Sequence, residues 1–335
     1  MEKKSTVALF GAGSWGTALA LQLARNGSIV NLWGHQADHI DSMISANENS
    51  TYLPGIFLPS TIRPTASIAG CLVDADVVLI AIPSKAFRTF LKLLKPFIDP
   101  TMSVFWASKG FEIDSGKLLH ELVMEELPGH NYGVVSGPTF ATEVAKSLPA
   151  AITCAGNDGS TAKYFSSLLH GSRFRCYTSD DVIGVELGGA LKNILAIAVG
   201  TADGLGFGAN TRAALITRGL AEVMRLGAEL GARQETLMGL AGLGDLILSC
   251  TDDQSRNRRF GLAIGQGKTV EQAVFEVKQT VEGLRAAKAI YLIAQKMRVE
   301  LPIMEQTYHV LYNNKDPRDA VKALEDRPQR SELNR

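Results

Sequence analysis

A lysine stands in a long apolar stretch of this sequence. Lys192 lies within residues 184–198, which otherwise consist mostly of Leu, Ile, Val, Ala and Gly. In an apolar helix the charged form of a lysine is disfavoured, so its pKa falls and the amine can accept a proton as a general base. The pattern also fits a lysine whose stem packs while its ammonium reaches water. Gly188 and Gly189 weaken a helix, and they therefore indicate close approach of another group.

A carboxylate follows a glycine-rich turn further along the chain. Asp245 comes directly after residues 241–244, which contain two glycines, and it precedes an apolar run. At the start of a helix an aspartate commonly serves as the N-cap. It can also pair with a lysine or hold a substrate hydroxyl. The sequence leaves these roles open.

Three arginines are concentrated in residues 254–259, near a predicted helix start. Guanidinium groups bind phosphate through paired hydrogen bonds, and the N–H groups of a helix N-terminus add to them. The segment therefore predicts a phosphate site, with a solvated basic face or a nucleic-acid contact as the alternatives. The lack of interleaved aromatic residues argues against nucleic acid. Glu282 is interpreted as a carboxylate at the start of another helix.

A glycine motif near the N-terminus predicts dinucleotide binding. An apolar strand at residues 7–10 leads into the motif, and an apolar helix follows over 17–24. Gly11 makes the tight turn, Gly13 lets the backbone approach a pyrophosphate, and Gly16 permits close packing of helix on strand. The N-terminus of the helix offers its N–H groups to the phosphates. A purely structural turn is the alternative.

The acidic residue that usually binds the adenosine ribose is missing. In NAD-specific sites an Asp or Glu near the end of the second strand binds the ribose 2′-hydroxyl. Here the second strand, residues 28–35, carries His35 in that place. A histidine does not repel a 2′-phosphate and can carry a proton toward it. NADP is therefore permitted as well as NAD, although an exposed strand-end histidine also fits the spacing.

Strand and helix patterns alternate through residues 1–180 and then become helical. This order predicts an α/β fold: a Rossmann-like, doubly wound parallel sheet over 1–180, followed by an all-helical domain over 181–335. Further strands are expected at residues 76–83, 103–107, 132–135, 150–154 and 174–177, a loop at 47–64, and long helices at 182–199 and 211–230.

Ligands bind at the carboxyl ends of strands in such sheets. Residues 82–83, Lys109 and residues 137–139 each follow a predicted strand. We therefore expect them to rim the same crevice as the glycine motif.

The composition excludes several classes of function. The 335 residues suffice for two domains, and 46% of them are hydrophobic. A net charge of zero argues against nucleic-acid and anionic-membrane partners. The four cysteines show no paired spacing, and no apolar run approaches about 18 residues, which predicts a soluble, cytoplasmic protein with no membrane span. The histidines do not cluster at ligand spacing, so no metal is expected.

Taken together, these stretches resemble the bacterial type of NAD(P)-dependent glycerol-3-phosphate dehydrogenase. The resemblance implies interconversion of sn-glycerol 3-phosphate and dihydroxyacetone phosphate, which in bacteria supplies phospholipid synthesis. A homodimer and a small phosphorylated substrate are the expected partners. A reductase of the 3-hydroxyacid or 6-phosphogluconate type, or a NAD(P)H-sensing protein without turnover, are the alternatives. The matching segments are residues 11–17, 108–110, 136–141, 184–193, 242–245, 255–258 and 281–283.

The resemblance also implies a role for each matching residue. Lys192 is expected to be the proton acceptor, Lys109 a second lysine at substrate and cofactor, and Asp245 a carboxylate beside the substrate. The other implied substrate contacts are Gly137, Thr139, Ser255, Arg256 and Asn257. The implied contacts to NAD or NADP are Gly11, Gly13, Ser14, Trp15, Gly16, His35, Lys109, Ala141, Arg256, Val281 and Glu282.

Overall fold

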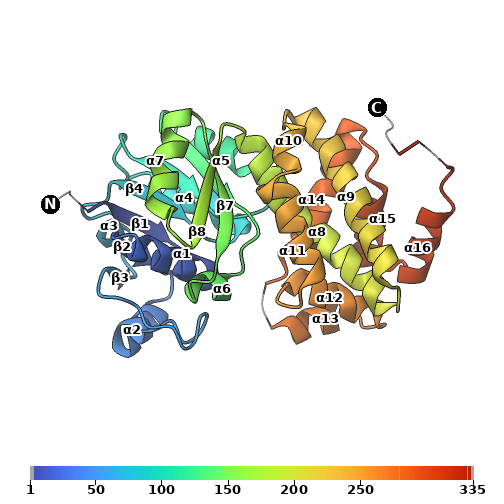
Figure 1. Cartoon of the computed structure of the whole chain (residues 1–335), viewed down its shortest axis with the longest axis horizontal. Helices are drawn as coiled ribbons and strands as arrows, with labels where there is room; N and C mark the ends of the chain where they lie inside the picture. Colours follow the sequence, from blue (N-terminus) through green and yellow to red (C-terminus); the bar gives the residue numbers. More distant parts are fainter. Residues whose placement is uncertain (1–3, 279, 330, 333–335) are drawn as a thin grey trace. The chain divides into compact units, whose positions relative to one another are not determined.

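The structure is a computed structural model that describes residues 4–278, 280–329 and 331–332, and it divides into two compact units (Figure 1). The first unit comprises Met1–Gly189 and Leu230–Asp245, and the second comprises Ala190–Glu229 and Leu246–Arg335. The chain first passes between them within the long helix α8 (Val182–Gly204).

An eight-stranded sheet forms the centre of the first unit. The strands are β1 (Thr6–Phe10), β2 (Ile29–Trp33), β3 (Ile62–Thr65), β4 (Val77–Ile80), β5 (Ser103–Trp106), β6 (Tyr132–Ser136), β7 (Ala150–Gly156) and β8 (Phe174–Ser179). They lie in the order β3-β2-β1-β4-β5-β6-β7-β8. Every neighbouring pair is parallel except β6 and β7. The order on either side of β1 is that of a Rossmann-like sheet, as predicted.

Both faces of this sheet are covered by helices. In β1, Val7 and Leu9 belong to one buried cluster, whereas Ala8 and Phe10 belong to another. The same alternation occurs in β4 and β5, so these three strands are apolar except for Thr6 and Ser103 at their first positions. The first cluster includes residues of α1 (Ser14–Arg25), α6 (Ala141–Ala145) and α7 (Gly159–Leu169), and the second includes residues of α4 (Phe87–Leu94) and α5 (Leu119–Glu126).

Two parts of the first unit differ from the sequence prediction. The edge strand β3 overlaps the end of the loop predicted at residues 47–64. Pro64 argued against a strand there, because proline cannot donate a ladder hydrogen bond and is tolerated only at an edge. The sheet is not wholly parallel, because β7 runs antiparallel to β6. Residues 137–149 between these strands contain only the short helix α6 and make no parallel crossover. The unpredicted elements are α2 (Ala37–Ala46), α3 (Ile68–Cys71), α6 and the short helical turn η1 (Ser84–Ala86).

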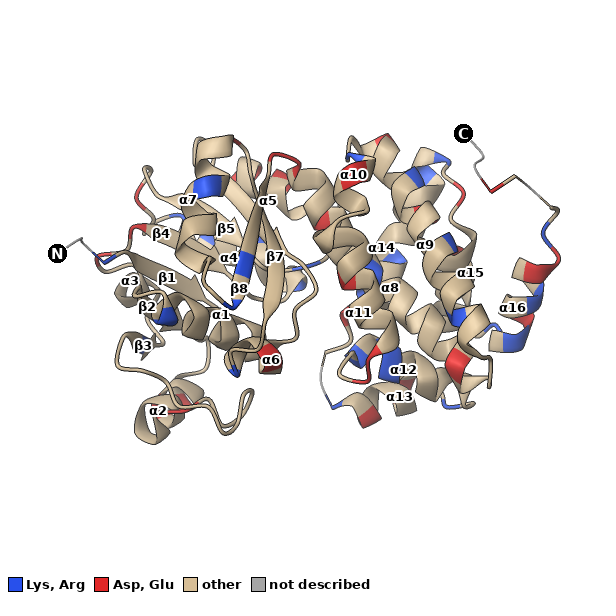
Figure 2. Cartoon of the chain, viewed as in Figure 1, with Lys and Arg blue, Asp and Glu red and all other residues tan. Residues whose placement is uncertain are grey.

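Helices are the regular secondary structure of the second unit, and no strand occurs among its described residues. Charged residues of both signs occur along the helices of both units (Figure 2), in keeping with the net charge of zero. Besides part of α8, the helices of the second unit are α9 (Ala209–Leu230), α11 (Asp245–Thr251), α12 (Arg256–Gly265), α13 (Val270–Val277), α14 (Glu282–Met297), α15 (Pro302–Tyr312) and α16 (Pro317–Glu325). One end residue of α9 and one of α11 belong to the first unit.

The expectation that no apolar segment is long enough to cross a membrane is wrong for one helix. Among the described residues, α8 meets that criterion by length and composition, with 23 residues and a mean hydropathy of 1.7 in its most apolar window. However, 83% of its most apolar window is buried inside the protein. Core helices of globular proteins have the same apolar composition, and α8 is buried as such helices are.

Candidate active site

The glycine motif forms the turn between β1 and α1, as predicted. Gly11 has a φ of +126°, and a Cβ atom there would lie 2.4 Å from the carbonyl oxygen of Ala81. A Cβ at Gly16 would lie 1.8 Å from the carbonyl oxygen of Gly11, so neither position accepts a side chain. At Gly13, the N-cap of α1, no atom lies within 4 Å of the Cβ position. The backbone is therefore open at the helix N-terminus, which fits a bound pyrophosphate.

A buried asparagine outside the motif holds this turn. Asn49 Nδ2 donates to the carbonyl oxygen of Ala12 over 2.9 Å and to Thr17 Oγ1 over 2.8 Å. Ser14 Oγ donates to the carbonyl oxygen of Tyr52 over 2.8 Å. The loop after α2 thus fixes the glycine turn from outside. The sequence analysis missed Asn49, because nothing in its local pattern indicates a partner 37 residues away.

The other predicted cofactor residues of the first unit lie at element ends. Trp15 is in the first turn of α1, and its buried indole Nε1 has no hydrogen-bond partner among the described residues. A buried donor of this kind fits a ligand that supplies an acceptor. His35 follows β2 and is exposed, and Ala141 begins α6.

Lys109 and Asp245 form an ion pair. Lys109 Nζ lies 2.5 Å from Asp245 Oδ2, with the two side chains 15% and 0% exposed. Lys109 follows β5, while Asp245 begins α11 after the π-helical turn η2 (Leu240–Gly244). Of the roles left open by the sequence, the structure therefore shows pairing with a lysine. A fully buried carboxylate needs such a partner, because its desolvation is otherwise costly.

The paired glycines of α8 lie where two other segments approach closely, as predicted. A Cβ at Gly188 would lie 2.4 Å from the carbonyl oxygen of Ala241. At Gly189 it would lie 2.7 Å from Ser136 Oγ and 3.3 Å from Cδ of Lys109. Gly189 thus gives the stem of Lys109 its place beside α8.

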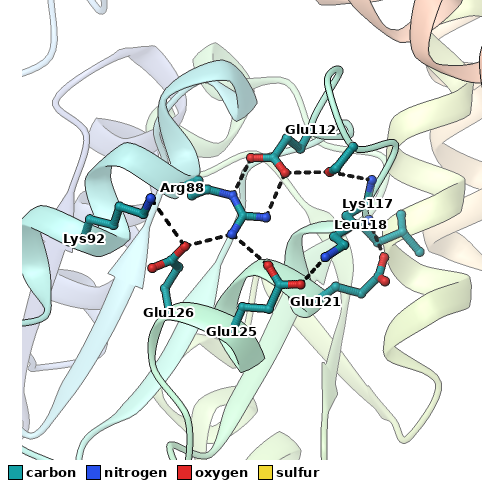
Figure 3. Close-up of polar contacts among 9 residues, drawn as sticks. Arg88, Lys92, Glu112, Lys117, Leu118, Glu121, Glu125 and Glu126 are labelled. Atoms are coloured by element: carbon teal, nitrogen blue, oxygen red, sulfur yellow. Dashed lines mark hydrogen bonds and ion pairs between the residues drawn. The ribbon is translucent and has the colours of Figure 1, made fainter.

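An arginine that binds three glutamates holds the loop after Lys109 (Figure 3). Arg88, on α4, donates from Nε and Nη2 to the two carboxylate oxygens of Glu112 over 2.6 and 2.8 Å. Its Nη1 donates to Glu125 and Glu126 of α5, each over 2.7 Å. The hydrogen bonds from Arg88 lower the pKa of Glu112. The network joins α4, α5 and the loop, and no motif in the sequence indicates it.

The carboxyl ends of four parallel strands carry the predicted substrate loops. Because β1, β4, β5 and β6 are parallel, these ends lie at one edge of the sheet, as predicted. Ser108 Oγ donates to the carbonyl oxygen of Ile82 over 2.6 Å and links two of them. Thr139 Oγ1 donates to the carbonyl oxygen of Gly137 over 3.2 Å, within the loop after β6.

The predicted phosphate segment begins a helix in the second unit. Ser255 is the N-cap of α12, and its Oγ accepts from the N–H of Arg258 over 3.3 Å. Arg256 and Arg259 are exposed. Arg258 is buried instead, and its Nη2 lies 2.7 Å from Asp203 Oδ2. One of the three arginines therefore pairs with a carboxylate inside the unit, and the cluster is not a uniform basic face.

An asparagine pair joins this segment to α8 and α14. Asn257 Nδ2 donates to Asn193 Oδ1 over 2.9 Å, and Asn257 Oδ1 accepts from the N–H of Gly283 over 3.0 Å. Lys192, the neighbour of Asn193, is half-buried in α8. Val281 is the N-cap of α14 and Glu282 its first residue, which confirms the predicted helix start. Asn257 is thus joined to the residue after Lys192 and to the residue after Glu282.

A Rossmann-like sheet, an open glycine turn and a buried lysine–aspartate pair at the carboxyl ends of the strands define a class of protein. Together with the helical unit, they describe a two-domain dehydrogenase that uses a nicotinamide dinucleotide. Family models for the N-terminus and C-terminus of NAD-dependent glycerol-3-phosphate dehydrogenase match residues 6–162 and 181–322. The chain belongs to this family.

Individual relatives agree with the family assignment. The glycerol-3-phosphate dehydrogenase [NAD(P)+] of Pseudoalteromonas translucida is 51% identical over 330 residues, which cover 98% of each chain. The crystal structure of the Coxiella burnetii glycerol-3-phosphate dehydrogenase is 47% identical, with a TM-score of 0.94 over 97% of this chain and 99% of that one. The Saccharomyces cerevisiae enzyme is 28% identical, with a TM-score of 0.84 over 97% and 100% of the two chains.

Proposed function

We propose that this chain interconverts sn-glycerol 3-phosphate and dihydroxyacetone phosphate, with NAD or NADP as the redox partner. The observation that carries the proposal is the ion pair of Lys109 and Asp245 at the carboxyl edge of the sheet, in a chain of this family. The pair places a positive charge beside the strand ends where ligands of such sheets bind.

The proposed proton chemistry uses two lysines. In the oxidation direction Lys192 accepts the proton of the C2 hydroxyl, and in reduction it returns one. Lys109 stabilises the negative charge that develops on the same oxygen, while Asp245 orients Lys109. The dinucleotide, whose pyrophosphate the glycine turn would hold, would supply the hydride chemistry that no side chain provides.

The proposed substrate contacts bind the phosphate, which is at the end of the substrate that does not react. Ser255, Arg256 and Asn257 start α12, where guanidinium and helix N–H groups suit a phosphate. Gly137 and Thr139 contact the substrate from the loop after β6. Binding free energy at the phosphate then positions C2 for reaction.

The proposed cofactor contacts follow from the fit of the glycine turn and of Trp15. Gly13 and the N-terminus of α1 would meet the pyrophosphate, and Gly11 and Gly16 shape the turn that presents them. The family resemblance supports the remaining contacts, which are Ser14, Trp15, His35, Lys109, Ala141, Arg256, Val281 and Glu282. NAD and NADP are both accepted.

Cofactor choice is testable at His35. No carboxylate stands there to repel a 2′-phosphate, so we expect turnover with NADPH. His35→Asp should shift the ratio of kcat/KM values toward NADH by about tenfold or more, since an added carboxylate favours the 2′-hydroxyl. Both cofactors are compared by the decrease in absorbance as they are oxidised. If the native enzyme used NADH alone, the argument from the missing carboxylate would be wrong.

One assay tests the proposed reaction. Purified protein is mixed with dihydroxyacetone phosphate and either NADPH or NADH, and cofactor oxidation is followed. We expect turnover with dihydroxyacetone phosphate. In the oxidation direction, with NADP or NAD supplied, we expect no turnover of 3-hydroxyacids or of 6-phosphogluconate. Turnover only with the latter substrates would replace the proposal with a different reductase, and cofactor binding without any turnover would indicate a sensor.

The wider setting is part of the same proposal. The reaction would supply glycerol 3-phosphate for phospholipid synthesis. The enzyme would act in the cytoplasm as a homodimer. The two family models support the division of the chain near residue 180 into a dinucleotide-binding and a substrate-binding domain. That division stays a prediction.

A further inference from the structure

A buried glutamate in the first unit has no part in the chemistry described above. Glu186 lies on α8, and its residue is 6% exposed. Its Oε1 accepts from the indole Nε1 of Trp106 and from the backbone N–H of His120, each over 3.1 Å. Its Oε2 lies 2.5 Å from Nδ1 of His120, which must carry the proton because a carboxylate only accepts. One carboxylate thus binds three donors from two elements.

Packing alone does not explain a carboxylate at this position. A buried carboxylate carries a desolvation cost that an apolar side chain of similar size avoids. Burial raises the pKa of Glu186, and the hydrogen bonds and charge of His120 offset part of that rise. Burial lowers the pKa of His120, but the hydrogen bond and charge of Glu186 outweigh it and leave that pKa raised. The raised pKa of His120 favours its charged form, whereas the raised pKa of Glu186 reflects the desolvation cost that the three hydrogen bonds offset only in part.

The partners of Glu186 lie next to Lys109. Trp106 is the last residue of β5, and Lys109 follows three residues later. On α8, Gly189 comes three residues after Glu186 and so lies on the same side of the helix. Gly189 is the residue whose Cβ position is 3.3 Å from Cδ of Lys109. Any shift of α8 relative to β5 therefore changes the space around the Lys109 side chain.

We propose that Glu186 is a positioning residue for Lys109. Its hydrogen bonds to Trp106 and His120 hold the start of α8 against the end of β5 and against α5. They thereby keep the Lys109 side chain in position to pair with Asp245. This inference rests on the proposed role of Lys109 in the reaction. Glu186 itself touches neither substrate nor cofactor in it.

The clamp formed by Glu186, His120 and Trp106 predicts a pH dependence. Glu121 of α5 also raises the pKa of His120, and on β6 burial and the charge of Glu186 raise the pKa of Tyr132. As pH falls, protonation of Glu186 removes the negative charge that binds the three donors. As pH rises, His120 loses its charge and the pair weakens. We expect kcat to follow both ionisations, because each changes the position of Lys109.

The test combines spectroscopy with kinetics. The indole N–H signals of the three tryptophans are followed by NMR against pH, and the signal lost in Trp106→Phe identifies Trp106. The Trp106 signal should titrate in the wild type and should not titrate in Glu186→Gln. In the same variant kcat should fall about tenfold, as expected for a displaced charged group, with the NADPH dissociation constant within about twofold.

Variants of His120 separate positioning from folding. His120→Asn keeps a donor near the place of Nδ1 but does not titrate, so it should retain most of kcat and lose the alkaline ionisation. His120→Ala removes the donor and should lower kcat about as much as Glu186→Gln. This pair serves as the test if Glu186→Gln does not fold. Glu305→Gln is the matched control, because Glu305 also pairs with a histidine, His309 at 3.8 Å, in a partly exposed position on α15.

Wild-type kcat and an unchanged pH profile in Glu186→Gln, or equal kcat in His120→Asn and His120→Ala, would overturn the proposal. Lys109→Ala distinguishes this failure from failure of the proposed site. If Lys109→Ala lowers kcat by about 10² while Glu186→Gln is normal, only the positioning role is refuted. If Lys109→Ala is itself normal, the assignment of Lys109 is refuted with it.

Discussion

Two lysines carry the proposed chemistry, and their surroundings suit different tasks. Lys109 is paired with the fully buried carboxylate of Asp245, and its stem lies beside Gly189. A lysine held in this way is a fixed positive charge, which suits stabilisation of a developing alkoxide. Lys192 lies half-buried in a helix that is otherwise mostly apolar. That setting suits the group that must exchange a proton.

Replacement of Lys192 tests this division. Lys192→Ala should lower kcat by about 10² or more, the lower range for a lost general base, while NADPH still binds. Lys192→Arg should not restore turnover, because a guanidinium stays protonated and cannot accept the proton. Steady-state kinetics and NADPH fluorescence measure the two effects. Near-normal turnover of the arginine variant would show that Lys192 supplies only charge.

Replacement of Arg256 tests the phosphate site. Arg256→Ala should raise the KM for dihydroxyacetone phosphate about 30-fold, which corresponds to roughly 2 kcal/mol for a lost charge-assisted contact. Arg259→Ala is the control, since Arg259 is also exposed and lies on the same helix. Its KM should stay within about twofold of the wild type. Equal increases in both variants would indicate a diffuse basic face in place of a site.

At the scale of elements, the position of Lys109 depends on a loop and its neighbours. The loop between β5 and α5 contains Gly110 directly after Lys109, and the φ of +129° at Gly110 and the closeness of Ser84 disfavour a side chain there. It ends where Glu121 binds the N–H of Leu118. Between these points Arg88 and Glu112 supply the main ionic link to α4. The loop is therefore held at both ends and in the middle.

Replacement of Arg88 tests this support. Arg88→Ala leaves three glutamates without their shared cation, so residues 111–118 should exchange amide hydrogens faster and kcat should fall several-fold. The loss of unfolding free energy should be modest, about 1 kcal/mol, because the network is partly exposed. Lys92→Ala is the control, since Lys92 is 61% exposed and lies 3.9 Å from Glu126. Faster exchange without any change in kcat would separate this loop from the position of Lys109.

At the scale of the whole molecule, a buried glutamate links stability to pH. Glu222 of α9 accepts from the backbone N–H groups of Ile303 and Met304 over 2.7 and 3.1 Å, at the start of α15. Burial raises its pKa from 4.5 to about 7, against the effect of these two hydrogen bonds. The folded protein therefore keeps a proton that the unfolded chain releases above about pH 4.5.

The sign of the effect follows from this difference. The stabilisation is complete below pH 4.5, falls as pH rises through about 7, and is absent above it. Glu222→Gln does not titrate, so the free energy of unfolding of the variant relative to the wild type should increase between pH 5 and 8, by at most about 3 kcal/mol. Urea unfolding at both pH values measures it. Glu229→Gln, an exposed change on the same helix, should show no such trend, and a flat difference for Glu222→Gln would refute the raised pKa.

Local patterns in the sequence were sufficient for much of the fold. The glycine motif, the continuous apolar runs of β4 and β5, and the change to helical periodicity near residue 180 each depend on neighbouring residues. The matching elements were therefore predicted close to their observed bounds: a strand was expected at residues 174–177, and β8 occupies Phe174–Ser179. Edge strand β3 was missed, because its proline suits an edge only once a neighbouring strand is known.

The sequence by itself determined the class of fold, the dinucleotide turn and the identity of the candidate residues. The tertiary structure alone decided their partners. Lys109 meets Asp245 across 136 residues, Glu186 meets His120 across 66, and Asn49 meets the glycine turn across 37. The physical reason is that a helix or strand pattern depends on a few successive side chains, whereas these pairs depend on how whole elements pack around the sheet.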